Sequence, residues 1–299
     1  MKKIGLVLGG GGGLGSYQIG VWKALKEYRV DEMITAISGA SVGVLNACLI
    51  AQNNYEIAEY IWTNEIEDKI LSKKKIDKNN NFISSHGIFT REGLIEIIEK
   101  YLNIDIVSNY EYPIYAAAVN LKKIDIEYFK LNGKSHKEIK EIMMATSAIP
   151  LIFGRQNIGG VNYIDGGVEI LNGNNLPITP LYNEDCDEII VINLYKDAAI
   201  EKNKNFKVYE IIPSKDIGDF FTGAMDFSLE GARMRLEEGY NDAKNLLERI
   251  SKMGKNHIEI MESSSRMYED EINNQIINKQ LKHKLHDAID NLRINDDEK

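Results

Sequence analysis

The chain has 299 residues, of which 43% are hydrophobic and 27% are charged, as in an average globular protein. This composition excludes a disordered chain, a collagen-like chain and a coiled-coil rod, and no apolar run reaches the ~18 residues that cross a bilayer. The 36 basic and 45 acidic residues leave a net charge of −9, which argues against wholesale binding to nucleic acid or to an anionic membrane.

Short apolar runs alternate with amphipathic stretches from the N-terminus onward. The run at 3–8 predicts a buried strand, and Ile19, Trp22 and Leu25 recur at helical spacing after it. In chain order, strands are predicted at 3–8, 33–38, 112–120, 124–130, 161–164 and 188–194, and helices at 15–28, 42–52, 54–63, 90–102 and 136–147. This alternation predicts a mostly parallel sheet with helices on both faces.

The two ends of the chain carry weaker signals. The apolar run at 4–8 is shorter than the ~7–15 residues of a signal-peptide core, so we expect a cytoplasmic protein. Residues 72–81 are polar and predict a loop, in which Lys73–Lys75 form a small basic patch. Apolar residues at helical spacing predict an amphipathic C-terminal helix, with a polar face of mixed charge. We therefore expect a main domain over 1–262 and a helical extension over 263–299 that caps the domain or pairs with another subunit.

The first strand is followed by a glycine-rich turn that opens a helix. The segment from Gly10 to Gly15 satisfies G-x-G-x-x-G, the pattern of dinucleotide sites. A Rossmann site needs an acidic residue at the end of the second strand, but Asp31 and Glu32 precede that strand. Amide groups of such a turn could instead bind an oxyanion that forms only during a reaction. Five consecutive glycines are entropically unfavourable in a fold, which favours a binding site over a plain turn.

A second glycine-flanked turn follows the predicted strand at 33–38. Gly39, Ser41 and Gly43 form G-x-S-x-G between an apolar strand and an apolar helix, the context of a nucleophile elbow. The alternative is that Ser41 merely caps the helix at 42–52. A cap does not require glycines two residues away on both sides, so the pattern favours a nucleophile.

A serine nucleophile needs a base within hydrogen-bond reach. The chain has 5 histidines, and only His257 lies at a plausible position in the chain order of a Ser-acid-His triad. A better candidate is Asp165, which follows a short apolar strand and precedes Gly166 and Gly167. An Asp-Gly turn is common by itself, but here three glycine-flanked turns occur, each at a predicted strand end.

At this point the sequence resembles the patatin-like phospholipase family. The matching motifs are Leu8–Gly20, Gly39–Gly43, Ala145–Pro150, Asp165–Gly167, Met225–Phe227 and Glu238–Lys244, so the similarity covers about residues 3–250. The resemblance implies a three-layer α/β/α fold and a Ser-Asp dyad without histidine. It also implies a glycine-rich oxyanion hole and hydrolysis of lipid acyl esters.

Carried over to this chain, the resemblance makes Ser41 the nucleophile and Asp165 the general base. The oxyanion hole would come from Gly10, Gly11, Gly12 and Gly13, with Gly15, Gly39, Gly43, Gly166 and Gly167 supporting the motifs. The chain departs from the family at Leu14, where Arg or Lys is usual, and in a longer loop at 171–175. Leu14 keeps a second hypothesis open, a lipid-binding or regulatory relative with weak or no catalysis.

The function that follows is that of a phospholipase A or lysophospholipase-like serine esterase. It requires no metal and no organic cofactor, and two cysteines, Cys48 and Cys186, are too few for a disulfide framework or a Cys-based zinc site. The expected partner is a phospholipid or another acyl-ester lipid, reached by brief contact with a membrane surface or as a dispersed substrate. No nucleic-acid partner is expected. An apolar channel for the acyl chain could be lined by Phe220, Phe221, Met225 and Phe227.

Overall fold

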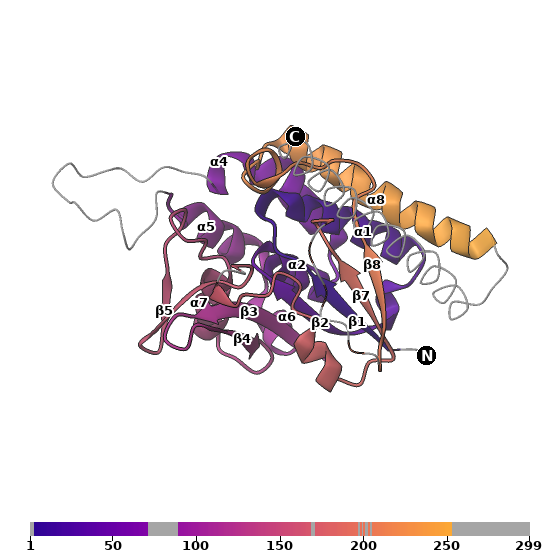
Figure 1. Ribbon diagram of the computed structural model, residues 1–299. Helices are drawn as coiled ribbons and strands as arrows, with labels where there is room; N and C mark the ends of the chain where they lie inside the picture. Colours follow the sequence, from indigo (N-terminus) through magenta and orange to yellow (C-terminus); the bar gives the residue numbers. More distant parts are fainter. Residues whose placement is uncertain are drawn as a thin grey trace, which may run out of the picture. The chain divides into compact units, whose positions relative to one another are not determined.

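A computed structural model describes residues 3–70, 89–168, 171–196, 198, 200, 203 and 205–252 (Figure 1). The chain forms two compact units, Met1–Asn245 and Leu246–Lys299, and the fold below is that of the first. The predicted loop at 72–81 and the predicted extension at 263–299 lie outside the described residues, and the domain boundary at 262 stays a prediction.

The elements alternate much as the sequence pattern predicts. The strands are β1 (Ile4–Leu8), β2 (Ile34–Ala40), β3 (Ile114–Asn120), β4 (Asp125–Lys130), β5 (Gln156–Ile158), β6 (Val161–Asp165), β7 (Glu188–Ile192) and β8 (Lys207–Ile211). The α-helices are α1 (Gly15–Glu27), α2 (Val42–Ala51), α3 (Tyr55–Tyr60), α4 (Glu67–Ile70), α5 (Glu92–Tyr101), α6 (Ile104–Ser108), α7 (His136–Thr146) and α8 (Leu229–Lys252). Short 3₁₀ helices span Gly12–Leu14 (η1), Asp31–Met33 (η2) and Thr179–Asn183 (η5), and π-helical turns span Ile61–Glu65 (η3) and Phe220–Ala224 (η6).

The strands form one mixed sheet in the order β5-β6-β3-β2-β1-β7-β8, with β4 paired to β3. The pairs β1–β2, β1–β7, β2–β3 and β7–β8 are parallel. The pairs β3–β4, β3–β6 and β5–β6 are antiparallel. The mostly parallel centre is confirmed, and the antiparallel pairs lie on the side of the sheet that begins at β3.

Side chains of β1 alternate between the two faces of the sheet. On one face, Leu176, Ile178 and Leu181 cover Val7 and Val191 in a buried cluster. On the other face, α2 packs against β1, β2 and β3, and α7 packs against β3 and β6. The three-layer arrangement is therefore confirmed, with η5 and its flanking chain as the layer opposite α2.

Helix α8, which the sequence pattern did not predict, packs against α1 through two glycines. A Cβ atom at Gly20 would overlap the carbonyl oxygen of Leu236, and one at Gly239 would overlap the carbonyl oxygen of Tyr17. The Tyr17 hydroxyl donates a 2.9 Å hydrogen bond to Asp242 Oδ2. The two helices thus meet backbone to backbone. None of the helices in the described ranges is long and apolar enough to cross a membrane.

This contact makes a stability prediction whose sign is informative. Helix propensity alone predicts that Gly239→Ala stabilises α8 by up to ~1 kcal/mol. Because the new methyl group would overlap the Tyr17 carbonyl, we expect destabilisation by ~1–3 kcal/mol instead. Urea unfolding measures the change, with Glu237→Ala on the exposed side of α8 as control. A more stable Gly239→Ala variant would contradict the close packing.

Candidate active site

Two strands meet end to end on β3, and both predicted catalytic residues lie at that junction. β4 pairs with one edge of β3 over Tyr115–Asn120, so β2 and β6 share the other edge. Ala40 of β2 pairs with Ala117, and Asp165 of β6 pairs with the next residue, Ala118. Because β2 runs parallel and β6 antiparallel to β3, their carboxyl ends face each other there. The topology brings Ser41 and Asp165 together across 124 residues of sequence.

Ser41 has the strained backbone of a nucleophile elbow. Its φ of 51° and ψ of −125° are unfavourable for a residue with a side chain. A Cβ atom at Gly39 would lie 2.6 Å from the carbonyl carbon of Gly43, and one at Gly43 would overlap the carbonyl oxygen of Leu8. The two glycines are thus required by close backbone approach. The Ser41 side chain makes no hydrogen bond to the amides of α2, so the interpretation of Ser41 as a helix cap is wrong.

Thr146, at the end of α7, holds this turn in place. The Ser41 amide donates a 2.8 Å hydrogen bond to Thr146 Oγ1, which in turn donates to the Ala117 carbonyl oxygen at 2.6 Å. Thr146 is fully buried. Thr146 lies within the family motif Ala145–Pro150, but the sequence pattern indicates no role for it.

Asp165 is a buried carboxyl group with one unpaired oxygen. Oδ1 accepts a 2.8 Å hydrogen bond from the Gly167 amide, while Oδ2 has no hydrogen-bond partner among the described residues. Burial raises the pKa of Asp165 to about 6, and interactions with the Ser41 hydroxyl and the Gly167 amide partly oppose that rise. Ser41 therefore lies beside Asp165, although the pair does not form a hydrogen bond of normal geometry in this resting state.

The glycines after Asp165 fit the crowding at the strand junction. A Cβ atom at Gly166 would overlap the carbonyl oxygen of Ala117, and one at Gly167 would lie 2.5 Å from Asn175 Oδ1. Any side chain at Gly166 would push β6 away from β3. The position of Asp165 beside Ser41 depends on this contact.

The glycine-rich turn presents amides toward the site and has its carbonyls bonded to the protein. The Gly10 amide donates to the Asn175 carbonyl oxygen at 3.2 Å, so this amide is not free for an oxyanion. Within the described residues, no hydrogen bond is formed by the amides of Gly11, Gly12 and Gly13. In contrast, every carbonyl oxygen from Gly9 to Gly13 accepts a hydrogen bond. The donors are, in order, Gln18 to Gly9, Asn175 to Gly10, Leu14 to Gly11, Gly15 to Gly12, and both Ser16 and Arg235 to Gly13. Unpaired amides beside fully bonded carbonyls are the pattern of an anion site.

Gly12 is the tightest point of this turn. Its φ is 51°, and a Cβ atom there would overlap the carbonyl oxygen of Ala224. Gly15, the last glycine of the motif, packs where a Cβ atom would lie 2.6 Å from Val42 and 2.9 Å from Trp62. Both positions exclude any larger residue.

A buried cation reaches the glycine turn from a distant part of the chain. Arg235 on α8 is 1% exposed, pairs with Asp226, and donates a 3.1 Å hydrogen bond to the Gly13 carbonyl oxygen. The Leu14 amide in turn donates to the Gly11 carbonyl oxygen at 3.0 Å. The Gly13–Leu14 and Gly11–Gly12 peptide groups thus form a chain of hydrogen bonds from the guanidinium to the Gly12 amide. Successive hydrogen bonds in such a chain polarise one another. Arg235 could not be predicted from the sequence, because it lies 222 residues from Gly13 and no local pattern relates the two.

Leu14, the departure from the family motif, has an apolar role. Its side chain is fully buried, and a Cβ atom at Gly223 would lie 2.6 Å from it. The longer loop at 171–175 also has a role, because the Asn175 side chain donates to the Gly10 carbonyl oxygen at 3.1 Å. That loop therefore braces the glycine turn.

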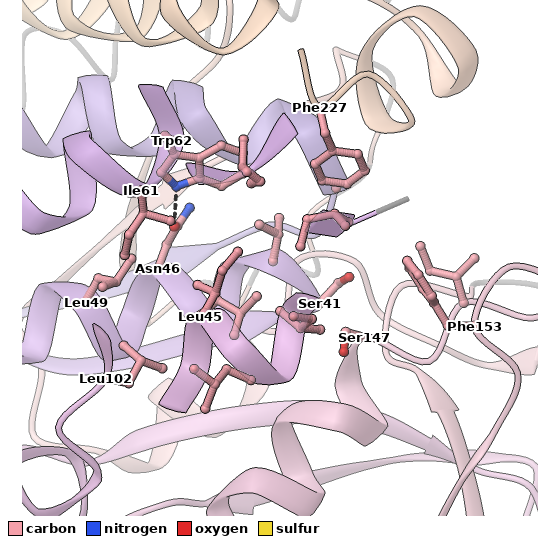
Figure 2. A pocket seen from close by; sticks show the side chains of 18 residues that line it. Ser41, Leu45, Asn46, Leu49, Ile61, Trp62, Leu102, Ser147, Phe153 and Phe227 are labelled. Atoms are coloured by element: carbon pink, nitrogen blue, oxygen red, sulfur yellow. Dashed lines mark hydrogen bonds between the residues drawn. The ribbon is translucent and has the colours of Figure 1, made fainter. Parts of the chain in front are cut away.

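An apolar pocket begins at Ser41 and extends along α2. Figure 2 shows Leu45 and Leu49 on successive turns of this helix, with Trp62 and Leu102 beside them and Phe153 and Phe227 at the other end. Leu49 lies eight residues beyond Ser41, about 12 Å along the helix. Asn46 is tied down because Trp62 Nε1 donates to its Oδ1 at 3.1 Å. The lining residues are Gly12, Ser41, Val42, Leu45, Asn46, Leu49, Ile61, Trp62, Ile66, Ile70, Leu94, Ile97, Ile98, Leu102, Ser147, Ile149, Phe153 and Phe227.

A second, more polar cavity meets the first at Ser41, Gly12 and Ile149. It contains Asp165 and Tyr195. Burial and the negative charge of Asp165 raise the pKa of Tyr195 to about 12, so its phenol stays protonated at neutral pH and can donate a hydrogen bond. The remaining lining residues are Gly10, Gly11, Gly167, Val168, Asn175, Ala198, Phe220 and Ala224.

The predicted channel aromatics divide between these two cavities and solvent. Phe227 lines the apolar pocket, Phe220 lines the polar cavity, and Met225 lines neither. Phe221 is 78% exposed, so its expected place in the channel is wrong.

The structure disfavours a dinucleotide at the glycine turn. Asp31 and Glu32 lie in η2, before β2, and pair with Lys26 and Arg29. Because the strand separates them from its Ser41 end, no acidic side chain of this pair is placed for a ribose. His257 lies outside the described residues. The described residues contain no cluster of three or more His, Cys, Asp or Glu side chains that could hold a metal ion.

The chain is similar in sequence to several known proteins. The sequence profile described as Patatin-like phospholipase matches residues 6–182. Lysophospholipase NTE1 of Cryptococcus neoformans is 27% identical over 196 residues, which are 64% of this chain and 11% of that protein. An uncharacterized NTE family protein of Mycobacterium bovis is 24% identical over 196 residues, 64% of this chain and 49% of that protein. This chain thus spans about a tenth of the first relative and about half of the second.

A similar solved structure is the crystal structure of VipD from Legionella pneumophila. It is 13% identical and has a TM-score of 0.49, with 83% of this chain and 67% of that chain covered.

The raised pKa of Asp165 makes a testable stability prediction. Since the native pKa of about 6 exceeds the ordinary 3.8, the charged carboxylate destabilises the fold. This penalty is absent below pH 3.8, grows between pH 3.8 and 6, and is constant above pH 6. We expect Asp165→Asn to raise the free energy of unfolding by ~1–3 kcal/mol above pH 6 and by much less at pH 4.

Urea unfolding at pH 4 and pH 7.5 measures this difference. Asp125→Asn, at an exposed strand end, is the matched control. An Asp165→Asn gain that is equal at both pH values would refute the link to ionisation.

Proposed function

The chain belongs to the patatin-like phospholipase family, and from this membership we propose that it is a serine esterase acting on lipid acyl esters. Ser41 is the nucleophile, Asp165 is the general base, and the amides of Gly11, Gly12 and Gly13 form the oxyanion hole. The observation that carries the proposal is the meeting of β2 and β6 on β3, which places the strained Ser41 beside the buried, half-unpaired Asp165.

In the first half-reaction, Ser41 Oγ attacks the ester carbonyl carbon while Asp165 Oδ2 takes the hydroxyl proton. Negative charge develops on the former carbonyl oxygen, where the three unpaired amides can donate. The intermediate collapses to an acyl-serine, and the leaving alcohol takes the proton from Asp165. A carboxyl with a pKa of about 6 is a better proton acceptor than an ordinary one and is still ionised at neutral pH.

In the second half-reaction, a water molecule takes the place of the alcohol. Asp165 accepts a proton from that water, whose oxygen attacks the acyl carbon. The fatty acid leaves as Ser41 regains its proton from Asp165. None of these steps uses a group beyond this chain and water.

The two cavities divide the substrate between them. The apolar pocket along α2 suits an acyl chain, because the seventeen residues that line it besides Ser41 are almost all apolar or small. The polar cavity suits the alcohol part of the ester, with Tyr195 and Asn175 as hydrogen-bonding groups. Phospholipids and lysophospholipids both fit this division.

The second hypothesis, a lipid-binding relative with little catalysis, was motivated by Leu14. Arg235 weakens that motivation, since it brings a buried positive charge to the same turn. Steady release of fatty acid from a panel of lipid substrates that is abolished by Asp165→Asn supports the esterase. Acyl-chain binding without turnover supports the alternative.

Covalent labelling tests the nucleophile directly. We expect Ser41→Ala to reduce the rate of reaction with a fluorophosphonate probe by at least ~10³-fold. Ser147→Ala is the matched control, because Ser147 lines the same pocket but donates its hydroxyl proton to the Met143 carbonyl oxygen. Labelling of wild type should increase with pH through about 6, as Asp165 loses its proton.

Three results would count against this assignment. Equal labelling of wild type and Ser41→Ala would exclude Ser41, and a rate that is flat between pH 5 and pH 8 would exclude Asp165 as the base. Loss of labelling in His257→Ala would favour a histidine base.

Chain-length preference tests the role of the apolar pocket. Leu49→Trp fills the pocket two helical turns from Ser41, so long acyl chains should lose at least ~10-fold in kcat/KM. Hydrolysis of a two- to four-carbon ester should stay nearly unchanged. Ile95→Trp, on the exposed side of α5, is the control. An equal loss for short and long chains would mean that the pocket does not hold the acyl chain.

A further inference from the structure

Large apolar side chains stand exposed on two turns at the mouth of the site. Leu151 is 75% exposed, Phe221 is 78% exposed and Phe220 is 45% exposed. Ile149 and Phe220 both line the polar cavity at Ser41. Leu151 lies two residues after Ile149, and Phe221 lies directly after Phe220. The two turns therefore flank one opening.

The first turn is short, closed and apolar throughout. It runs from Ile149 through Pro150, Leu151 and Ile152 to Phe153, and the Phe153 amide donates to the Ile149 carbonyl oxygen at 2.9 Å. Leu151 at its tip has a φ of 66°, an unfavourable value for a residue with a side chain. The fold thus holds an exposed leucine in a strained conformation at the tip of this turn.

The second turn presents Phe221 just as firmly. The Asp219 carboxylate accepts hydrogen bonds from the amides of Phe221 and Thr222, each at 2.8 Å. Phe220 and Phe221 contact each other edge to face, with ring centroids 5.3 Å apart. The turn therefore presents two aromatic rings at the surface. Moving these rings from water into an apolar environment is energetically favourable.

Both turns lead to the Ser41 end of the apolar pocket. Phe153 ends the first turn and Phe227 follows the second; both line the pocket, and Figure 2 shows them on the side of Ser41 away from Leu49 and Leu102. A lipid lifted from a bilayer at these tips would enter the pocket acyl chain first. Resting on the proposed function, this arrangement identifies where the substrate comes from.

We infer that Leu151, Phe220 and Phe221 form a docking rim that inserts into the surface of a zwitterionic lipid bilayer. The charges near the rim are of both signs: Arg155 is exposed beside the first turn, and Lys215, Asp216 and Asp219 are exposed beside the second. Together with the net charge of −9, this pattern does not suit an anionic bilayer. Attachment therefore depends on apolar insertion rather than on charge.

Flotation with phosphatidylcholine vesicles tests the rim. The full chain carrying Ser41→Ala is used so that lipid is not consumed, and Leu151→Gln with Phe221→Gln is added to it. We expect the double substitution to weaken vesicle partitioning by about tenfold or more. Ile106→Gln, which replaces a 41% exposed residue on α6, is the matched control and should partition like its parent.

Salt and lipid composition separate insertion from electrostatic attachment. Partitioning should be unchanged by 0.5 M salt and should not increase when phosphatidylglycerol replaces part of the phosphatidylcholine. Partitioning that requires phosphatidylglycerol, or that is equal with and without the double substitution, overturns the inference. A solution dimer that the double substitution dissociates, without vesicle binding, assigns the rim to a second copy and also overturns it.

Kinetics on the catalytically intact chain separate docking from chemistry. The double substitution should reduce hydrolysis of vesicle lipid about as much as it reduces partitioning, and hydrolysis of a soluble short-chain ester should stay within about twofold. An equal loss on both substrates overturns the inference. If wild type hydrolyses neither substrate, the proposed function fails, while flotation still decides whether the rim docks.

Discussion

The carbonyl oxygen of Ala117 is the point on which the site depends. The strands β2 and β6 end against β3 on either side of it, and Thr146 Oγ1 donates to it at 2.6 Å. Thr146 Oγ1 also accepts a hydrogen bond from the Ser41 amide. The backbone of Gly166 packs against the Ala117 carbonyl oxygen. A single peptide group thus fixes the positions of the Ser41 turn and of the Asp165 turn. Because only glycine fits at 166 and the Thr146 hydroxyl is buried, the backbones of the two turns are held close to each other.

The site stores unfavourable conformations and charges that the surrounding fold must offset. Ser41 has a positive φ, and Asp165 is ionised at neutral pH although it is buried and half unpaired. Three amides of the glycine turn also lack partners in the described residues. Around them, Gln18, Asn175 and Arg235 bond the carbonyls of the same turn. The supporting carbonyls are satisfied, while the unsatisfied amides and carboxylate oxygen belong to the candidate site, as expected when stability is given up for function.

Polarity changes in steps from the interior to the surface of this region. The pocket along α2 is apolar, the cavity with Asp165 and Tyr195 is polar, and the turns beyond carry Leu151 and Phe221 into solvent. An acyl ester has the same order of parts when it leaves a bilayer, with its acyl chain and its polar group on opposite sides of the carbonyl. The buried guanidinium of Arg235 adds positive charge behind the glycine turn without exposing it to lipid.

The amino-acid sequence by itself determined most of the elements and the three glycine-flanked turns of the candidate site. The pattern of apolar and polar residues is a local property, and it predicts most of the elements correctly. These are the strands β1, β2, β3, β4, β6 and β7 and the helices α1, α2, α5 and α7. Gly43 and Gly166 were predicted as motif residues, and the structure shows that close backbone approach leaves room only for glycine at both positions. The edge strand β8 and the helix α8 were missed, although apolar residues recur at helical spacing along α8.

The tertiary structure alone decided what surrounds those turns. The antiparallel entry of β6 beside β2, the Arg235 contact with Gly13 across 222 residues, and the bracing of Gly10 by Asn175 are long-range pairings. The apolar pocket likewise combines α2 with residues of η3 and α5. Each of these depends on which segments pack together, a property that burial of the whole core determines and that no single segment encodes.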